Sequence, residues 1–169
     1  GGIAVRRGDR HEAVIAYERA AKFHLPHPEV YYRLGRAYAA VGKYPEATLA
    51  FEESVRLLEE APEGAAGPEQ ENGLAIDIPS APQVATVYSW LGRVLLRMDD
   101  LAAAEAAYRK AVERGPALAD PHRALGEIYE SRGETDRAIT AYHQYLRLAP
   151  KGGETETVRR RIEILERAR

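Results

Sequence analysis

The residues whose chemistry and spacing point to a function are arginines. Arg36 and Arg93 each directly follow a Leu-Gly pair, so they occupy equivalent places in two similar segments. Arg97 follows Arg93 by four residues, which puts both side chains on one face of a helix. A guanidinium group binds a carboxylate through two parallel hydrogen bonds. Arginines aligned in this way predict a site for acidic side chains or for the carboxylate end of a peptide.

The chain contains His, Asp and Ser residues, but their spacing in the sequence matches no known catalytic or metal-binding motif. The chain has no Cys, which excludes disulfides, thiolate zinc sites and a cysteine nucleophile. His24 and His27 are close in sequence, but two imidazoles do not complete a metal site. Asp99 and Asp100 are adjacent and point apart, so they form no carboxylate dyad. The P-loop, GxSxG and HExxH motifs are missing from the sequence. We therefore predict a protein that is not an enzyme and has neither cofactor nor metal.

Composition and charge narrow the classes of partner. Apolar residues make up 45% and charged residues 30% of the chain, as in soluble globular proteins. The net charge of -2 argues against a general nucleic-acid partner. No apolar run has the length of a membrane-spanning helix, so we expect no membrane insertion. Because the chain begins with Gly rather than Met, a targeting signal cannot be judged and the compartment stays open. The excess of Arg over Lys and the abundant Ala are typical of a bacterial protein from a GC-rich genome.

An internal repeat is the strongest pattern in the sequence. Gly8 and Gly42 are 34 residues apart, and so are Gly92 and Gly126. The distance from Gly35 to Gly92 is 57 residues, which is one further repeat plus an insertion of 23. Around these glycines the same types return at the same offsets: a Leu-Gly pair, a turn residue, an Ala and an aromatic residue. Apolar spacings of three and four residues predict helices for every repeat.

Glycines inside three of the predicted helices need a geometric reason. Gly35, Gly92 and Gly126 each occupy a helix interior, where Gly costs about 1 kcal/mol relative to Ala. Because the same rule is broken at the same place in each repeat, we expect a close approach of two helix backbones there. Gly or Asp suits a backbone with positive φ at the predicted turns, which fall at Gly8, Gly42, Asp99 and Gly133.

These features resemble the tetratricopeptide repeat family, which has a period of about 34 residues and the pattern W-x2-L-G-x2-Y, A-x3-F and P. The resemblance covers nearly the whole chain except roughly residues 62–84 and the last helix. It implies an all-α fold, a right-handed superhelical α-solenoid of antiparallel helix pairs with a C-terminal capping helix. Such solenoids present an extended concave surface.

The repeat alignment divides the chain into segments of a single domain, residues 1–169. Val158, Ile162 and Leu165 form one apolar stripe that suits a capping helix. The segments are a partial repeat 1–27, repeats 28–61, 85–118 and 119–152, an acidic Pro- and Gly-rich insertion 62–84, and a capping helix 154–168. The insertion carries a charge of -4, and two uses of it stay open: a tolerated loop, or a built-in ligand for the arginines of its own chain.

The first helix of each pair should line the concave surface. Glu127 and Glu130 give the last repeat a mixed charge, and an ordinary solvated face with pairs such as Arg123–Glu127 is the alternative interpretation. Trp90, the single Trp, is either half exposed on this surface or packed beneath the insertion. The predicted peptide-binding residues are Tyr32, Arg36, Ser89, Trp90, Arg93, Arg97, Arg123 and Glu127.

The sequence therefore predicts a non-catalytic scaffold for complex assembly that binds an extended or acidic peptide segment of a partner protein. One alternative is a structural subunit that self-associates or packs into a larger complex or filament through its solenoid ends. Another is the recruitment domain of a larger enzyme or sensor. Family members that bind Glu-Glu-Val-Asp tails use Lys and Asn, whereas the only Asn here is Asn72 in the insertion. The resemblance thus implies peptide binding in general rather than that specificity.

Overall fold

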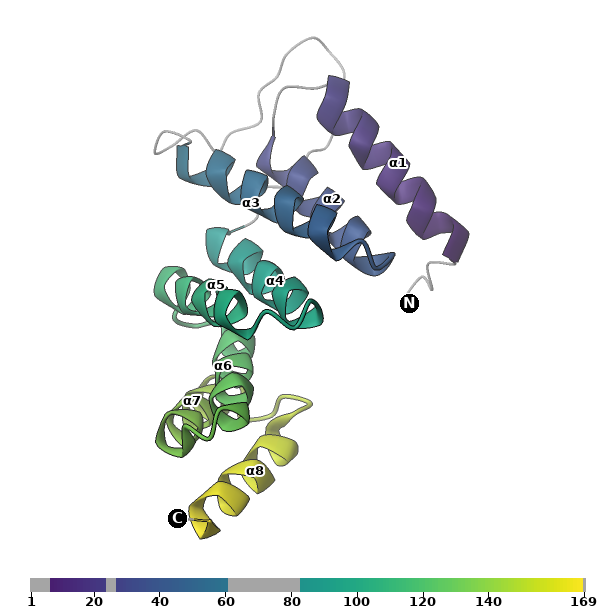
Figure 1. Ribbon diagram of the computed structural model, residues 1–169. Helices are drawn as coiled ribbons and strands as arrows, with labels where there is room; N and C mark the ends of the chain where they lie inside the picture. Colours follow the sequence, from purple (N-terminus) through teal and green to yellow (C-terminus); the bar gives the residue numbers. More distant parts are fainter. Residues whose placement is uncertain (1–6, 24–26, 61–82, 169) are drawn as a thin grey trace.

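The computed structural model describes residues 7–23, 27–60 and 83–168. These ranges form eight helices and no strand, stacked in chain order from α1 at one end to α8 at the other (Figure 1). The all-α solenoid predicted from the repeats is confirmed. The helices are α1 (Arg7–Phe23), α2 (Pro28–Ala40), α3 (Tyr44–Glu60), α4 (Val84–Arg97), α5 (Leu101–Arg114), α6 (Ala119–Ser131), α7 (Thr135–Leu148) and α8 (Thr155–Arg167).

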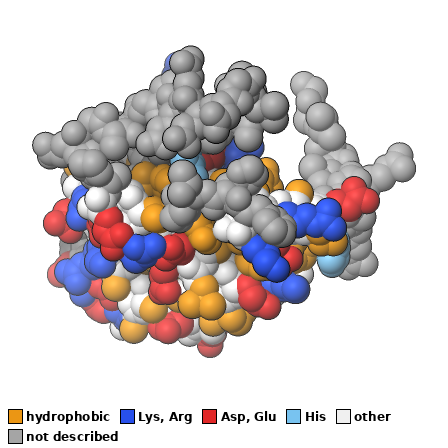
Figure 2. All heavy atoms as spheres, turned by 90° about the horizontal axis from the view of Figure 1, so that it is seen from above, with side chains coloured by type: hydrophobic (Ala, Val, Ile, Leu, Met, Phe, Trp, Pro, Cys, Tyr) orange, Lys and Arg blue, Asp and Glu red, His pale blue; other side chains and the backbone are white. Residues whose placement is uncertain are grey.

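Packing between the helices is almost entirely sequential. The pairs α2–α3, α4–α5 and α6–α7 have the most extensive contacts, and α3–α4 and α5–α6 join one pair to the next. Helix α1 packs on α2, and α8 packs on α7. The apolar core is consequently a row of clusters between successive helices rather than one closed centre. Basic and acidic side chains are interspersed on the face seen in Figure 2, in keeping with the small net charge.

The turns inside the three complete pairs use the same backbone conformation. Gly42, Asp99 and Gly133 have φ values of 82°, 61° and 72°, in the left-handed region. Glycine reaches this region without steric cost, and Asp is among the few other residues that tolerate it. The turn predicted at Gly8 is wrong, because α1 already includes this residue. Including Gly8 in α1 adds backbone hydrogen bonds to this helix, whereas a turn at this position would end it.

The glycines inside the first helices lie against aromatic rings of the second helices. A Cβ built on Gly35 would come within 2.8 Å of the Phe51 ring, and no real Cβ contact is that short. The expected close approach is therefore between a helix backbone and a ring, rather than between two helix backbones. The three pairs are Gly35 with Phe51, Gly92 with Tyr108, and Gly126 with Tyr142.

Helix α8 caps the last repeat. Its side chains Val158 and Ile162 are buried in the cluster formed with α6 and α7. Arg161 reaches back across α7 and donates hydrogen bonds to Glu130 Oε2 at 3.0 Å and to the Tyr142 hydroxyl at 3.3 Å. Glu130, expected at sequence level to give the ligand-facing surface a negative charge, instead anchors the cap.

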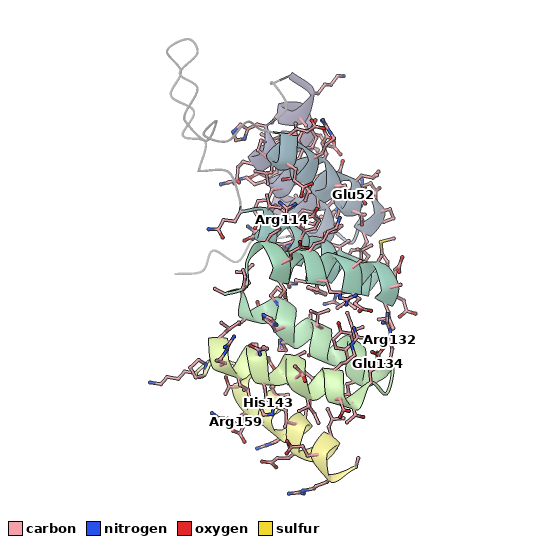
Figure 3. The ribbon with its side chains drawn as sticks, turned by 90° about the vertical axis from the view of Figure 1, so that its left-hand side faces the viewer. Glu52, Arg114, Arg132, Glu134, His143 and Arg159 are labelled. Atoms are coloured by element: carbon pink, nitrogen blue, oxygen red, sulfur yellow. The ribbon has the colours of Figure 1, made fainter. Side chains whose placement is uncertain are left out.

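Ion pairs join α5 to the α6–α7 pair near the turn of that pair. Glu105 of α5 pairs with Arg132 and, at 3.4 Å, with Arg137. Figure 3 shows Arg132 beside Glu134 where α6 meets α7, with 3.9 Å between their charged groups. The guanidinium of Arg137 also lies 4.0 Å from the centre of the Tyr129 ring. These contacts fix the orientation of the α6–α7 pair on the pair before it.

Most of the predicted insertion lies outside the described residues. Helix α3 ends at Glu60 and α4 begins at Val84, so the stretch 61–82, with its apolar part Leu74–Ile78, falls between them. Whether the insertion covers Trp90 or serves as a built-in ligand stays a prediction. No helix within the described ranges is both long and apolar enough to cross a membrane.

Candidate functional site

A groove of about 1190 Å³ runs along the first helices of the solenoid. Its walls come from α1, α2 and α4, with contributions from α3, α5 and α6. The repeat places equivalent side chains of α2 and α4 next to one another, which is why residues distant in sequence meet here. Six of the eight predicted binding residues line this groove: Arg36, Trp90, Arg93, Arg97, Arg123 and Glu127.

The other two predicted residues lie just outside the groove. The ring of Tyr32 is half-buried, with its centre 6.1 Å from that of Phe51 and 5.6 Å from the guanidinium carbon of Arg36. Ser89 lines a smaller neighbouring cavity of about 320 Å³, which shares Trp90 with the main groove. The ring of Tyr32 therefore helps to position Arg36 in the groove, whereas Ser89 lines the smaller cavity beside it.

An aromatic and cationic cluster occupies the middle of the groove. The guanidinium carbons of Arg36 and Arg93 lie 4.9 Å and 4.3 Å from the centre of the Trp90 ring. The indole itself stacks on Phe51, with 6.4 Å between ring centres and 27° between ring planes. Cation–π attraction of this kind contributes about 0.5–1 kcal/mol at exposed sites. Trp90 thus ties side chains from α2, α3 and α4 together, and it is half-buried rather than fully covered.

Three groove arginines form no ion pair with any carboxylate that the structure describes. Arg36, Arg93 and Arg97 are exposed, and none of them takes part in an ion pair among the described residues. Their guanidinium groups are consequently available to a ligand, and two of them are already held in place by an aromatic ring.

The α6 side of the groove is different, because its charges are paired. Arg123 and Glu127 form an ion pair at 2.6 Å, which was the alternative that the sequence left open for this face. The Nε atom of Arg123 is buried and has no hydrogen-bond partner within the described ranges. Burial raises the pKa of the nearby Tyr108, an effect that the positive charges of Arg93 and Arg123 partly offset. Tyr108 therefore stays neutral at physiological pH.

The sequence did not single out the groove residues of α1 and the start of α2. Glu29 is buried and accepts a hydrogen bond from Arg33 at 2.5 Å. Hydrogen bonds with Tyr17 and Glu29 raise the pKa of Arg33. Arg10 donates to the carbonyl oxygen of Ala40 at 3.4 Å. Arg33 precedes Arg36 by three residues, a helical spacing that could have identified it, but the contacts of Arg10 and Tyr17 depend on how α1 docks.

The described ranges contain no cluster of three or more His, Cys, Asp or Glu side chains that could hold a metal ion. What the groove offers chemically is a set of fixed guanidinium and aromatic groups, suited to recognising a ligand.

Comparisons with known proteins identify the repeats. Two family models described as tetratricopeptide repeat match residues 28–61 and 82–153. A search of curated proteins found no match. Among solved structures, a crystal structure of MamA is similar with a TM-score of 0.72 and 23% identity, over 96% of this chain and 80% of that one.

Two further structures share the fold. MamA from Desulfovibrio magneticus RS-1 has a TM-score of 0.66 and 20% identity, over 97% of this chain and 89% of that one. YrrB, described as a TPR protein with an unusual peptide-binding site, has a TM-score of 0.60 and 20% identity, over 85% of this chain and 62% of that one. The chain belongs to the tetratricopeptide repeat family, whose members are typically non-catalytic scaffolds for protein–protein interaction.

Proposed function

We propose that the groove binds an extended acidic segment of a partner protein. Arg36, Arg93 and Arg97 would bind the carboxylates, and Trp90 would hold two of these arginines in position. The observation that carries the proposal is that three exposed arginines of α2 and α4 line the groove and form no ion pair with the residues that the structure describes. A guanidinium that is already oriented loses less conformational entropy when a ligand binds.

The charge of the groove favours an acidic ligand. Six arginines and two glutamates line it, so its lining is strongly positive although the whole chain carries -2. Within the pairs Glu29–Arg33 and Arg123–Glu127 the opposite charges compensate each other. The surplus positive charge of the lining is therefore carried by Arg36, Arg93 and Arg97, together with Arg10 of α1, and a matching negative segment would gain both association rate and specificity there.

The shape of the groove favours an extended ligand. The groove is lined by residues from α1 to α6, so it passes several successive helices. A strand-like peptide advances about 3.3 Å per residue, more than twice the rise of about 1.5 Å in a helix, so a short extended segment can contact several of these helices at once. Between the arginines, small side chains such as Ala37 and Ala40 leave room for a peptide backbone. The description of YrrB names a peptide-binding site on the same fold, which supports this interpretation.

Binding of a labelled glutamate-rich peptide, followed by fluorescence anisotropy, tests the proposal. We expect saturable binding that weakens as salt increases, and no comparable binding of the matching glutamine-rich peptide. Arg36→Ala combined with Arg93→Ala should weaken binding at least tenfold. Because Trp90 is the only Trp, its intrinsic fluorescence gives a second readout in the unaltered chain.

A matched control separates the groove from the general surface. Arg159 of α8, labelled in Figure 3, is exposed and is not among the residues that line the groove, so Arg159→Ala removes one positive charge elsewhere. This variant should bind the glutamate-rich peptide as the unaltered chain does. Equal binding of the acidic and neutral peptides, or full binding by the double variant, would contradict the proposal.

A further inference from the structure

Two groove arginines from different helices meet on one aromatic ring. The guanidinium carbon of Arg36 on α2 lies 4.9 Å from the centre of the Trp90 ring, and that of Arg93 on α4 lies 4.3 Å from the same point. Arg36 also lies 5.6 Å from the centre of the Tyr32 ring. Because both guanidinium groups border one indole and both side chains are exposed, an anion at the edge of this ring is within reach of both.

The ring that these arginines share is held in place by the core. Trp90 stacks on Phe51, with 6.4 Å between the ring centres. Phe51 is completely buried, and its own ring lies against Gly35 of α2. The indole is therefore a fixed support that orients the two guanidinium groups before a ligand arrives, which reduces the conformational entropy lost on binding.

The charge gathered at this ring exceeds that of a single carboxylate. Neither Arg36 nor Arg93 forms an ion pair with a carboxylate that the structure describes. The two glutamates of the groove lining are already engaged in ion pairs with other arginines. Two like charges near one point repel each other, and an anion that contacts both removes this repulsion. An anion with two negative charges matches the pair most completely.

The acidic groups available on a protein segment differ in how well they match two guanidinium groups. A carboxylate has one charge and two oxygens, which the fork of a single guanidinium group can occupy. A phosphoserine carries a charge of about −1.5 to −2 at neutral pH and has three acceptor oxygens. It can therefore accept hydrogen bonds from two guanidinium groups that come from different helices, and it compensates both of their charges.

We propose that Arg36 and Arg93 together bind a phosphoserine of the partner segment, so that phosphorylation of the partner controls its affinity for the groove. This inference rests on the proposed function, because the phosphoserine is part of the extended acidic segment. Arg97, one helical turn after Arg93, is left for a carboxylate of the same segment. A nucleic acid matches the pair less well, because each phosphodiester group carries one charge and the whole chain is negative.

Three labelled peptides that differ at one place test the inference. Each is the glutamate-rich peptide of the binding experiment above, with a phosphoserine, two glutamates or a serine at its centre. The phosphoserine and the two glutamates carry nearly the same charge, so a difference between these peptides reports on the geometry of the anion. We expect the phosphoserine peptide to bind the 169-residue chain at least tenfold tighter than the diglutamate peptide, measured by fluorescence anisotropy. Because the whole chain is used, its own carboxylates compete with all three peptides alike.

Lysine variants separate the guanidinium fork from its charge. Arg36→Lys and Arg93→Lys keep the positive charge but lose the planar set of donors that two oxygens of one anion can share. Each should reduce the preference for phosphoserine over diglutamate to about twofold or less, while the affinity for the diglutamate peptide falls less than threefold. Arg159→Lys is the matched control, because Arg159 is exposed on α8 and does not line the groove. This variant should keep the full preference.

Failure of this inference and failure of the proposed function give different results. Equal binding of the phosphoserine and diglutamate peptides would overturn the inference and leave the proposed function standing, whereas the proposed function fails if neither the diglutamate nor the serine peptide binds. A preference for phosphoserine that both lysine variants retain would also overturn the inference.

Two competitors identify the source of the phosphate group. Inorganic phosphate should displace the phosphoserine peptide only at a concentration at least a hundredfold higher than the unlabelled phosphoserine peptide requires. Displacement at equal concentrations would overturn the inference, because the arginines would then bind a free ion. Tighter binding of a labelled single-stranded oligonucleotide than of the phosphoserine peptide would overturn it as well, because the ligand would then be a nucleic acid.

Discussion

Gly92 of α4 lies so close to the ring of Tyr108 on α5 that a Cβ on the glycine would come within 2.9 Å of three ring carbons. Tyr108 is 2% exposed and belongs to the packed interior, so the ring has little room to move away. The glycine is therefore a condition for packing the first helix on the second, and the same relationship recurs in the other two complete pairs.

Replacing Gly92 with Ala should destabilise the protein, although Ala ordinarily favours a helix by about 1 kcal/mol over Gly. Forcing an extra carbon into a packed contact typically costs about 1–3 kcal/mol. We expect the free energy of unfolding, measured by urea denaturation, to fall by an amount in this range. Gly153→Ala is the control, because a Cβ there would have no neighbour within 4 Å. A stabilised Gly92→Ala variant would show that the contact relaxes without cost.

The capping helix should depend on Arg161. Its guanidinium donates to both Glu130 and Tyr142, and thereby ties α8 to the last repeat. Removing the side chain leaves those oxygens without this donor, at a cost of about 1 kcal/mol. In the Arg161→Ala variant, the rate of backbone hydrogen exchange should increase more in α8 than in α4. The neighbouring Arg159, 3.9 Å from Glu156 with both side chains exposed, is the control residue. Equal exchange in the Arg161→Ala and Arg159→Ala variants would refute this role.

The sequence predicted the helix pairs because the same pattern of residues occurs in several repeats. The Leu34-Gly35 pair recurs with an Ala and an aromatic residue at fixed distances after it, a spacing that fits two helices packed on each other. It also placed Arg36, Arg93 and Arg97 on one surface, since equivalent positions of a repeat must align. The nature of the glycine contact was not predictable, because a helix pattern does not reveal which group of the next helix approaches it.

The remaining parts of the groove depend on tertiary contacts. Tyr17 and Arg10 enter it only because α1 docks on α2, and an incomplete repeat gives no sequence rule for that docking. Glu130 follows Glu127 by three residues and should share its face, yet it bonds to Tyr142 and Arg161 of later helices. A long charged side chain can reach several hydrogen-bond partners. The partner that it contacts therefore depends on how the helices pack, and the spacing of residues in the sequence does not determine it.

Stability should fall in mild acid because of His122. Burial lowers the pKa of this imidazole from its ordinary value of about 6.5, although a hydrogen bond to the backbone of Pro116 acts in the opposite direction. Below the ordinary value the unfolded chain therefore binds more protons than the folded chain, and the free energy of unfolding decreases as the pH falls through that region.

The His122→Gln variant should reduce this dependence of stability on pH, measured by denaturation at a series of pH values. His143→Gln removes another imidazole, one that is exposed on α7 (Figure 3), and should retain the dependence seen in the unaltered chain. The interpretation fails if the two variants lose stability in parallel between neutral pH and mild acid.

The spacing of acidic residues in a bound segment should matter, if the groove binds such a segment as proposed. Arg93 and Arg97 are one helical turn apart on α4, and side chains in that relation start about 5–6 Å from each other. In an extended peptide, alternate residues point the same way and repeat about every 6.6 Å. Peptides with glutamates at alternate positions should bind about fivefold tighter than peptides of equal charge with adjacent glutamates, a difference of about 1 kcal/mol. Arg97→Ala should abolish this preference while retaining part of the affinity. If both peptides bind the unaltered chain equally, the arginines act as a diffuse positive surface, because a fixed pair of guanidinium groups would discriminate between the two spacings.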